Sequence, residues 1–197
     1  MDPIPSNYYD FFGLEHRLHL DLKDLEKRFY ALSRQYHPDR YTLKSRAEQQ
    51  VALDATAVLN DAYRTLRDPL ARAEYLLKEN GFDIGEQGSK NVPPELLDEV
   101  FELNMQLEEL KMNQKMGEDD ASLTADIAKH KVVLEAKHDK LLEELQSYWK
   151  EWDALVDRNL PAGSADGKQI TSKMVDVLNR RNYIRNLLRD VNAALEN

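Results

Sequence analysis

The chain contains no cysteine among its 197 residues. This absence excludes disulfide bonds, thiolate metal sites, cysteine-ligated clusters and a cysteine nucleophile. Glycine and proline are also scarce, at 7 residues each, whereas 32% of the residues are charged. Few helix-breaking residues combined with many charged ones are typical of long helices with large solvated faces.

The sequence also lacks a membrane segment, because no apolar run approaches the roughly 20 residues that a spanning helix needs. Its first five residues match neither a secretory signal nor a transit peptide. We therefore expect a soluble cytoplasmic protein with no membrane partner.

Negative charge is concentrated in the second half of the chain. Residues 1–80 carry 12 Lys and Arg against 13 Asp and Glu, whereas residues 81–197 carry 15 against 23. A segment with this excess of acid is repelled by phosphate, so we expect no nucleic-acid partner. Its surface is either a protein-binding surface or simply a solvated one.

The triplet His37-Pro38-Asp39 interrupts the helical pattern of the first half. Proline cannot continue a helix, and it pushes the residue before it out of the α conformation. We expect an exposed turn that presents the imidazole of His37 and the carboxylate of Asp39. A match of three residues is weak by itself, but the flanking segments predict two helices that lead away from the turn.

The helix before this turn is predicted to begin at Asp21, a favourable N-cap residue. One face is apolar and carries Leu22, Leu25, Phe29, Leu32 and Tyr36. Nearly opposite lie Lys23, Lys27, Tyr30 and Arg34. Exposed basic residues usually form only a solvated face, but this basic side leads directly into the turn at His37.

Three further helices complete the predicted first domain. A short one, capped by Ser6, extends to about Gly13. Another spans roughly residues 43–67, and Asp68-Pro69 ends it and begins a helix that stops at Asn80-Gly81. The residues predicted to face inward from the helix at 43–67 are Ala47, Val51, Val58, Ala62 and Leu66.

The remaining chain reads as a connector over residues 81–92 followed by helices at about 94–116, 120–159 and 168–196. Short loops favour antiparallel neighbours, so these helices predict a three-helix bundle. Each has an apolar stripe, interrupted in the last helix by Arg181, whose charged end we expect to reach the solvent. The stripes contain Leu96, Val100, Leu103, Leu107 and Leu110; Ile127, Leu134, Leu141, Leu145, Tyr148, Trp152 and Leu155; and Ile170, Met174, Val177, Ile184, Val191 and Leu195.

The helix at 94–116 has a second apolar stripe, formed by Leu97, Phe101 and Met105 at i, i+4 and i+8. Glu102, Glu108 and Glu109 border it. One interpretation is a wide apolar arc that faces two neighbouring helices of the bundle. The other is an exposed patch with an acidic rim, which is typical of protein docking sites.

Residues 7–77 resemble a J-domain, the module of DnaJ-type co-chaperones that stimulates Hsp70. The resemblance rests on Tyr36-His37-Pro38-Asp39-Arg40, on the two flanking helices and on the segment Ala62-Tyr63-Arg64-Thr65-Leu66-Arg67-Asp68-Pro69. It implies that His37, Pro38 and Asp39 trigger ATP hydrolysis by an Hsp70 partner. It also implies that the neighbouring Lys23, Lys27, Arg34 and Arg40 help to bind that partner.

The resemblance extends to nearly the whole chain through residues 67–77, Gly81-Phe82-Asp83 and the segment from Leu97 to Leu107. These residues are similar to those of the HscB family, the J-proteins of iron–sulfur cluster assembly, in a bacterial form without the cysteine-rich zinc module of some relatives. The family implies an IscU-type scaffold protein as partner. The contact residues so implied are Leu97, Phe101, Glu102, Met105, Glu109 and Tyr183, with Asp98 replacing an apolar contact of the family and Met105 standing where some relatives have an acid.

Enzyme chemistry is not indicated, and we expect no cofactor and no metal. Asp126 and His130 lie one helical turn apart, but further ligands are missing. His37 and Asp39 form an acid–base pair without a phosphate loop or a nucleophile motif. A metal-dependent hydrolase built on these two residues stays a remote alternative, and a J-protein for another client is a nearer one.

We therefore predict an all-α co-chaperone with a J-domain at 1–80, a linker at 81–92 and a three-helix bundle at 93–197. The J-domain is an antiparallel helical hairpin with short flanking helices. The predicted protein delivers an iron–sulfur scaffold to a specialised Hsp70 of the HscA or DnaK type and activates the ATPase of that Hsp70.

Overall fold

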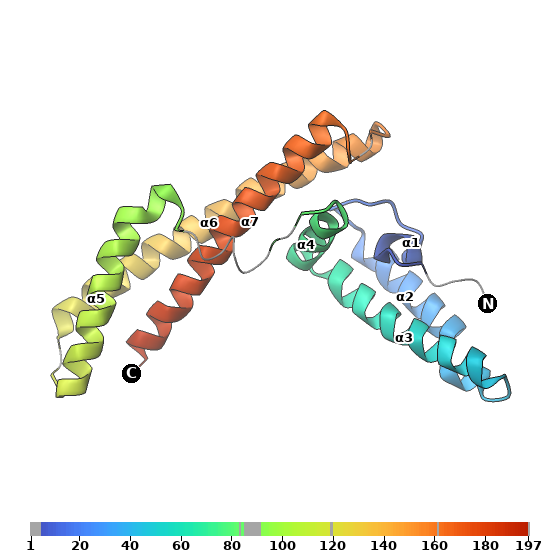
Figure 1. Cartoon of the computed structure of the whole chain (residues 1–197), viewed down its shortest axis with the longest axis horizontal. Coiled ribbons are helices and arrows are strands. Elements are labelled where there is room, and N and C mark those ends of the chain that lie inside the picture. The colour runs from blue at the N-terminus through green and yellow to red at the C-terminus, as the bar shows by residue number, and fades with distance from the viewer. Residues whose placement is uncertain (1–4, 83, 85–91, 119, 161, 197) are drawn as a thin grey trace. The chain divides into compact units, whose positions relative to one another are not determined.

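A computed structural model describes residues 5–82, 84, 92–118, 120–160 and 162–196 (Figure 1). Within these ranges all regular elements are helices, which confirms the predicted all-α class, and none is long and apolar enough to cross a membrane. The helices are α1 (Tyr8–Phe12), α2 (Leu22–Tyr36), α3 (Arg46–Arg67), α4 (Pro69–Glu79), α5 (Leu97–Met116), α6 (Ala121–Asp157) and α7 (Ala165–Leu195), with 3-10 helices η1 (Pro38–Tyr41) and η2 (Pro94–Leu96).

The chain divides into two compact units. The first unit contains the described residues within 1–83 and 149–170, and the second contains those within 84–148 and 171–197. The sequence predicts residues 149–170 as part of the bundle, whereas their contacts group them with the first unit. Of the predicted linker, residues 83 and 85–91 lie outside the described residues.

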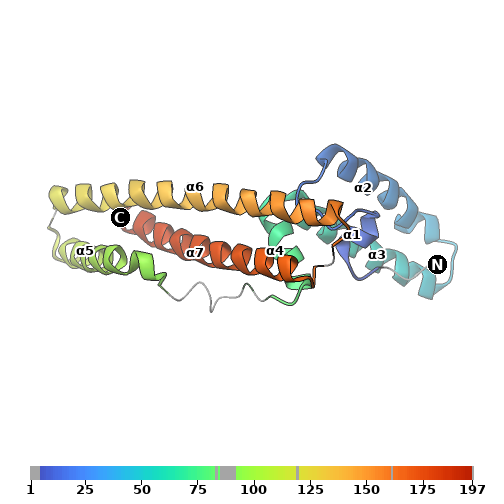
Figure 2. The same ribbon diagram turned by 90° about the horizontal axis from the view of Figure 1, so that it is seen from above.

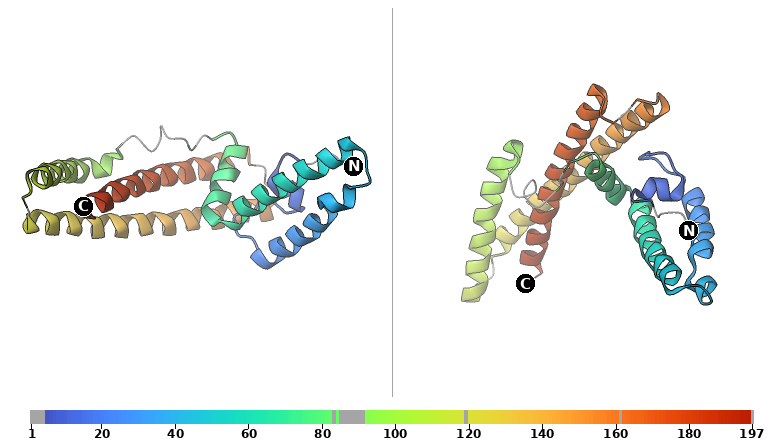
Figure 3. Two further views of the ribbon diagram at one scale, coloured as in Figure 1. Left: turned by 90° about the horizontal axis from the view of Figure 1, so that it is seen from below. Right: turned by 45° about the vertical axis from the view of Figure 1, so that its right-hand side comes forward.

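In the first unit, α2 and α3 run antiparallel and pack against each other (Figure 3). Helix α1 contacts both of them, and α4 contacts α3. Aromatic and leucine side chains fill the space between these helices because burial removes their apolar surface from water. The most buried of them are Tyr9, Phe12, Leu18, Leu25, Leu59, Leu66, Leu76 and Leu77.

Local capping sets the ends of these helices. Asp21 caps α2 and Asp68 caps α4, with Pro69 at its first position, as predicted. Asn7, not Ser6, caps α1 by accepting the backbone N–H groups of Tyr9 and Asp10. Helix α3 begins at residue 46 instead of about 43, because Ser45 and Glu48 form a capping box there.

The buried face of α3 differs from the prediction. Ala62 and Leu66 are buried as expected, but Ala47 is exposed and Val51 and Val58 are half-buried. Alanine gives a weak hydrophobic signal, yet alanines form much of the face where α3 packs on its neighbours. The buried residues of this helix are Ala52, Ala55, Leu59, Ala62 and Leu66.

In the second unit, α6 and α7 run antiparallel with α5 beside them (Figure 2). Lys137 on α6 binds Glu99 on α5, and the side-chain amide of Gln114 donates to the carbonyl of Ala194 on α7. The predicted stripes of these helices are buried except for Tyr148 and Leu195, which are half-buried. Arg181 is only 8% exposed, so the prediction that its charged end reaches the solvent is wrong.

The end of α6 contacts the loop between α1 and α2 within the first unit. The carboxylate of Asp153 accepts hydrogen bonds from the backbone N–H groups of Leu18 (2.7 Å) and His19 (2.9 Å). The indole N–H of Trp152 donates to the carbonyl of His16 at 2.9 Å. These bonds satisfy backbone groups that belong to no helix, and they hold the loop that leads into α2.

Candidate functional site

The triplet His37-Pro38-Asp39 lies where α2 ends and η1 begins. His37 leaves the helical conformation at φ −59° and ψ 126°, as its position before proline predicts. The backbone N–H of Asp39 donates to Nδ1 of His37 at 3.3 Å, and a carboxylate oxygen of Asp39 lies 3.5 Å from the same nitrogen. The imidazole side chain is 53% exposed and the carboxylate 85%.

Three side chains donate hydrogen bonds to the last backbone carbonyls of α2 and so stabilise the turn that follows. The last carbonyls of any helix lack partners inside the helix and need donors from elsewhere. At the end of α2 these donors come from residues that follow the turn in sequence. They are Arg40 Nη1 to the Arg34 carbonyl (3.2 Å), Tyr41 Oη to the Gln35 carbonyl (3.1 Å) and Thr56 Oγ1 to the Tyr36 carbonyl (3.1 Å).

The basic side of α2 is exposed at Lys23, Lys27 and Arg34. Tyr30 lies among them with more than half of its surface in contact with solvent. Arg40 differs from these residues because its guanidinium binds the backbone of Arg34. Its bracing contact was not predicted from the sequence, since it depends on how the turn folds back on α2.

The second apolar stripe of α5 is exposed. Leu97, Phe101 and Met105 are each more than half exposed, so the interpretation of this stripe as a packing arc is wrong. Met112 and Met116 continue the stripe along the same face and were missed by the sequence reasoning, although their spacing of seven and eleven residues from Met105 is the helical signal that identifies them. A groove of about 620 Å³ follows this face, lined by Phe101, Asn104, Met105, Glu108, Glu109, Met112, Asn113 and Met116.

Acidic side chains lie beside this groove. Asp98, Glu102 and Glu109 are exposed on α5. Glu108 and Glu109 both line the groove, and Glu108 pairs with Lys111 at 3.1 Å. Tyr183 lies on α7 and is half-buried, and this burial raises the pKa of its phenol. The acidic residues and Tyr183 therefore come from two different helices of the second unit.

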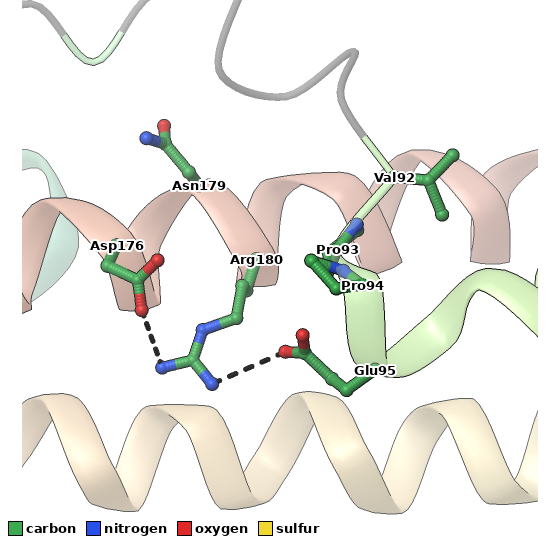
Figure 4. A pocket seen from close by; sticks show the side chains of 7 residues that line it. All are labelled: Val92, Pro93, Pro94, Glu95, Asp176, Asn179 and Arg180. Atoms are coloured by element: carbon green, nitrogen blue, oxygen red, sulfur yellow. Dashed lines mark ion pairs between the residues drawn. The ribbon is translucent and has the colours of Figure 1, made fainter.

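A second pocket, of about 590 Å³, lies between η2 and α7 (Figure 4). Its polar centre is Arg180, whose guanidinium pairs with Asp176 at 2.9 Å, Glu144 at 3.4 Å and Glu95 at 3.5 Å. Three carboxylates around one guanidinium leave no positive charge to attract an anion. We interpret Arg180 as a structural contact that joins α7 to α6 and η2.

The described residues offer little for metal chemistry. They contain no group of three or more His, Asp or Glu side chains arranged to hold an ion. Asp126, a candidate ligand with His130, instead pairs with Lys129 at 2.8 Å.

Comparison with known proteins agrees with these features. Residues 7–75 match the DnaJ domain family, and this range contains the His37 turn with its two flanking helices. Chaperone HscB from Vibrio cholerae is 27% identical, with a TM-score of 0.58 over 95% of this chain and 96% of that one. The human co-chaperone HscB shares the fold, with 21% identity and a TM-score of 0.63 over 97% of this chain and 83% of that one. The chain therefore contains a DnaJ domain and is similar over nearly its whole length to HscB co-chaperones.

Proposed function

We propose that the His37-Pro38-Asp39 turn activates the ATPase of an Hsp70 chaperone of the HscA or DnaK type. The observation that carries this proposal is the combination of exposure and rigidity at the turn. Its imidazole and carboxylate face the solvent, while Arg40, Tyr41 and Thr56 hold the end of α2 in place. A rigid turn binds without a large loss of conformational entropy, so its geometry can be read by a partner.

The basic side of α2 has a separate role in this proposal. Lys23, Lys27 and Arg34 are exposed on the helix that ends at His37. Exposed charges act mainly on the rate of encounter and on its dependence on salt. These residues would guide an acidic surface of the Hsp70 toward the turn, and the turn would then make the specific contact.

The exposed face of α5 is the proposed docking site for an IscU-type iron–sulfur scaffold protein. Apolar residues with an acidic rim suit a partner whose apolar contact surface is bordered by basic residues. The proposed contact residues are Leu97, Phe101, Glu102, Met105 and Glu109 of α5, with Tyr183 of α7. Asp98 adds a further carboxylate to the rim, and Met112 and Met116 extend the apolar contact.

Together these two surfaces make the protein a delivery factor of the cytoplasm. We assign Hsp70 activation to residues 1–80 and scaffold binding to residues 93–197, with 81–92 between them. A scaffold held by the same chain that binds Hsp70 has a raised effective concentration at the chaperone. ATP hydrolysis would then close the Hsp70 on the scaffold and favour release of its iron–sulfur cluster to acceptors.

The first test measures single-turnover ATP hydrolysis by the Hsp70 with the full-length protein. We expect wild type to accelerate hydrolysis and His37→Gln to lose the acceleration while keeping its fold by circular dichroism. His130→Gln, the same substitution on α6, serves as the matched control and should stimulate like wild type. Stimulation that survives His37→Gln would show that the trigger lies elsewhere.

The second test measures calorimetric binding of the full-length protein to the apo scaffold. The double variant Leu97→Ala with Phe101→Ala should lose binding. Val132→Ala with Val133→Ala removes two exposed apolar side chains from α6 and should leave binding unchanged. A wild-type protein that stimulates Hsp70 but binds no scaffold would be a J-protein for another client.

A further inference from the structure

The loop after the triplet presents a leucine almost entirely to solvent. Leu43 is 99% exposed, the highest value among the exposed large apolar residues of the described chain. Single exposed leucines are common on protein surfaces and need no explanation by themselves. Leu43 is unusual because of how its backbone is held and because of what lies next to it.

The backbone on both sides of Leu43 is clamped by one side chain. The side-chain Nε2 of Gln49, a residue in the first turn of α3, donates to the backbone carbonyl of Thr42 at 3.2 Å and to that of Lys44 at 3.0 Å. The backbone N–H of Lys44 also donates to the carbonyl of Tyr41 at 2.9 Å. The residue between these bonds is therefore held in one position with its side chain directed outward.

The same loop is bonded to the His-Pro-Asp turn. The hydroxyl of Thr42 donates to the carbonyl of Asp39 at 3.1 Å, and the capping box of Ser45 and Glu48 fixes the other end of the loop at the start of α3. The triplet and Leu43 thus belong to one braced segment. We expect a partner that docks on the exposed His37 and Asp39 side chains to reach Leu43, which lies four residues after Asp39 in the same segment.

The charges around Leu43 indicate the kind of surface that it fits. Lys44 is its neighbour in sequence, and Arg40 and Arg46 lie three residues to either side, all of them exposed. Their positive charge favours a partner surface with acidic side chains around an apolar pocket. Burial of a leucine in such a pocket is favourable, and the clamp by Gln49 reduces the entropy lost on docking.

We propose that Leu43 is a specificity contact for the Hsp70 partner and inserts into an apolar, acid-rimmed pocket beside the site that receives His37 and Asp39. This proposal rests on the Hsp70 function proposed above and adds to it a second, apolar contact. Leu43 contributes affinity and choice of Hsp70, whereas the triplet contributes the trigger. The two roles separate in a titration, because a lost affinity contact changes the concentration needed and not the maximal rate.

The test titrates full-length variants against the Hsp70 and measures ATP hydrolysis. Leu43→Ser should raise the concentration for half-maximal stimulation about tenfold, as expected for an apolar contact at an interface centre, with the maximal rate unchanged. Leu43→Met should stay close to wild type. Leu53→Ser, which changes a half-exposed leucine in the second turn of α3, is the matched control and should have no effect.

Gln49→Ala tests the clamp separately. Loss of its two hydrogen bonds frees the loop, so we expect a smaller rise in the half-maximal concentration, about threefold. A wild-type value for Leu43→Ser overturns the proposal, and a wild-type value for Gln49→Ala overturns the role of the clamp. A wild-type protein that gives no stimulation overturns the proposed Hsp70 function itself, and with it the role of Leu43.

Discussion

The phenol of Tyr8 donates a hydrogen bond of 2.6 Å to the carboxylate of Asp61, which joins α1 to α3. The ring of Tyr8 also stacks on that of Tyr75 in α4, with centroids 4.3 Å apart. The hydrogen bond to Asp61, helped by burial, raises the pKa of Tyr8 to about 12. The same bond, together with Arg64, lowers the pKa of Asp61. Tyr8 therefore joins α1 both to α3 and to α4.

Removal of the hydroxyl by Tyr8→Phe should lower the free energy of unfolding by about 1 kcal/mol, the usual net value of one hydrogen bond. Urea unfolding at pH 7 measures this difference, with the exposed Tyr30→Phe as a control that should change little. Because the folded protein holds the Tyr8 proton more tightly, the stabilisation is complete below pH 10 and lost as the pH rises toward 12. If the difference in unfolding free energy between wild type and Tyr8→Phe persisted unchanged above pH 12, the Tyr8–Asp61 hydrogen bond would not be its cause.

Charge reversal on the basic side of α2 should act on association with Hsp70. Lys27→Glu places a negative charge where the proposed partner surface is acidic, so we expect the association rate to fall roughly tenfold at low salt. Raising the ionic strength should shrink this effect because salt screens exposed charges. Stopped-flow binding measures the association rate and its dependence on salt. Lys150→Glu, the same substitution on α6, is the control. An equal loss at low and high salt would indicate damage to the fold.

Truncating a side chain on the buried face of α5 should lower the stability of the protein, whereas truncating one on the exposed face should weaken scaffold binding. Leu103 is 1% exposed, and Leu103→Ala should lower the free energy of unfolding by about 2–5 kcal/mol through the cavity that it leaves. Phe101 is 69% exposed, and Phe101→Ala should change the free energy of unfolding by less than about 0.5 kcal/mol. Scaffold binding should be weakened by Phe101→Ala. A large loss of stability in Phe101→Ala would mean that this face packs inside the protein.

His138 should make the second unit sensitive to acid. Burial, followed by the charge of Arg181, lowers its pKa below the ordinary value of 6.5, against a smaller opposing effect of Asp139 and a further lowering by Arg185. The unfolded chain therefore binds this proton more readily, and stability should fall as the pH drops below about 6.5. We expect His138→Leu to reduce this fall in thermal unfolding between pH 8 and pH 5. If the thermal stability of the variant and of the wild type fell equally between pH 8 and pH 5, His138 would not be the cause of the acid sensitivity.

Local signals in the sequence were sufficient for most helix boundaries. Asp21 and the pair Asp68-Pro69 cap their helices as predicted, because an N-cap interacts only with backbone groups within the next turn. The exposed turn at His37 follows from the same kind of rule, since proline restricts its own residue and the one before it. The buried stripe of Leu96 in η2 and of Val100, Leu103, Leu107 and Leu110 in α5 was also predicted, because its spacing repeats at the helical period.

Tertiary structure decided the features that depend on distant partners. Periodicity left the stripe of Leu97 and Phe101 open between packing and exposure, and only the position of the neighbouring helices shows that nothing in the described chain covers it. The brace that Thr56 provides at the end of α2 joins residues twenty apart in sequence, and Asp153 binds the loop at Leu18 across 135 residues. Sequence thus determines where most helices begin and end, because those interactions lie within one turn. Which face is buried and which carbonyl is satisfied depend on contacts that form only when distant segments pack together.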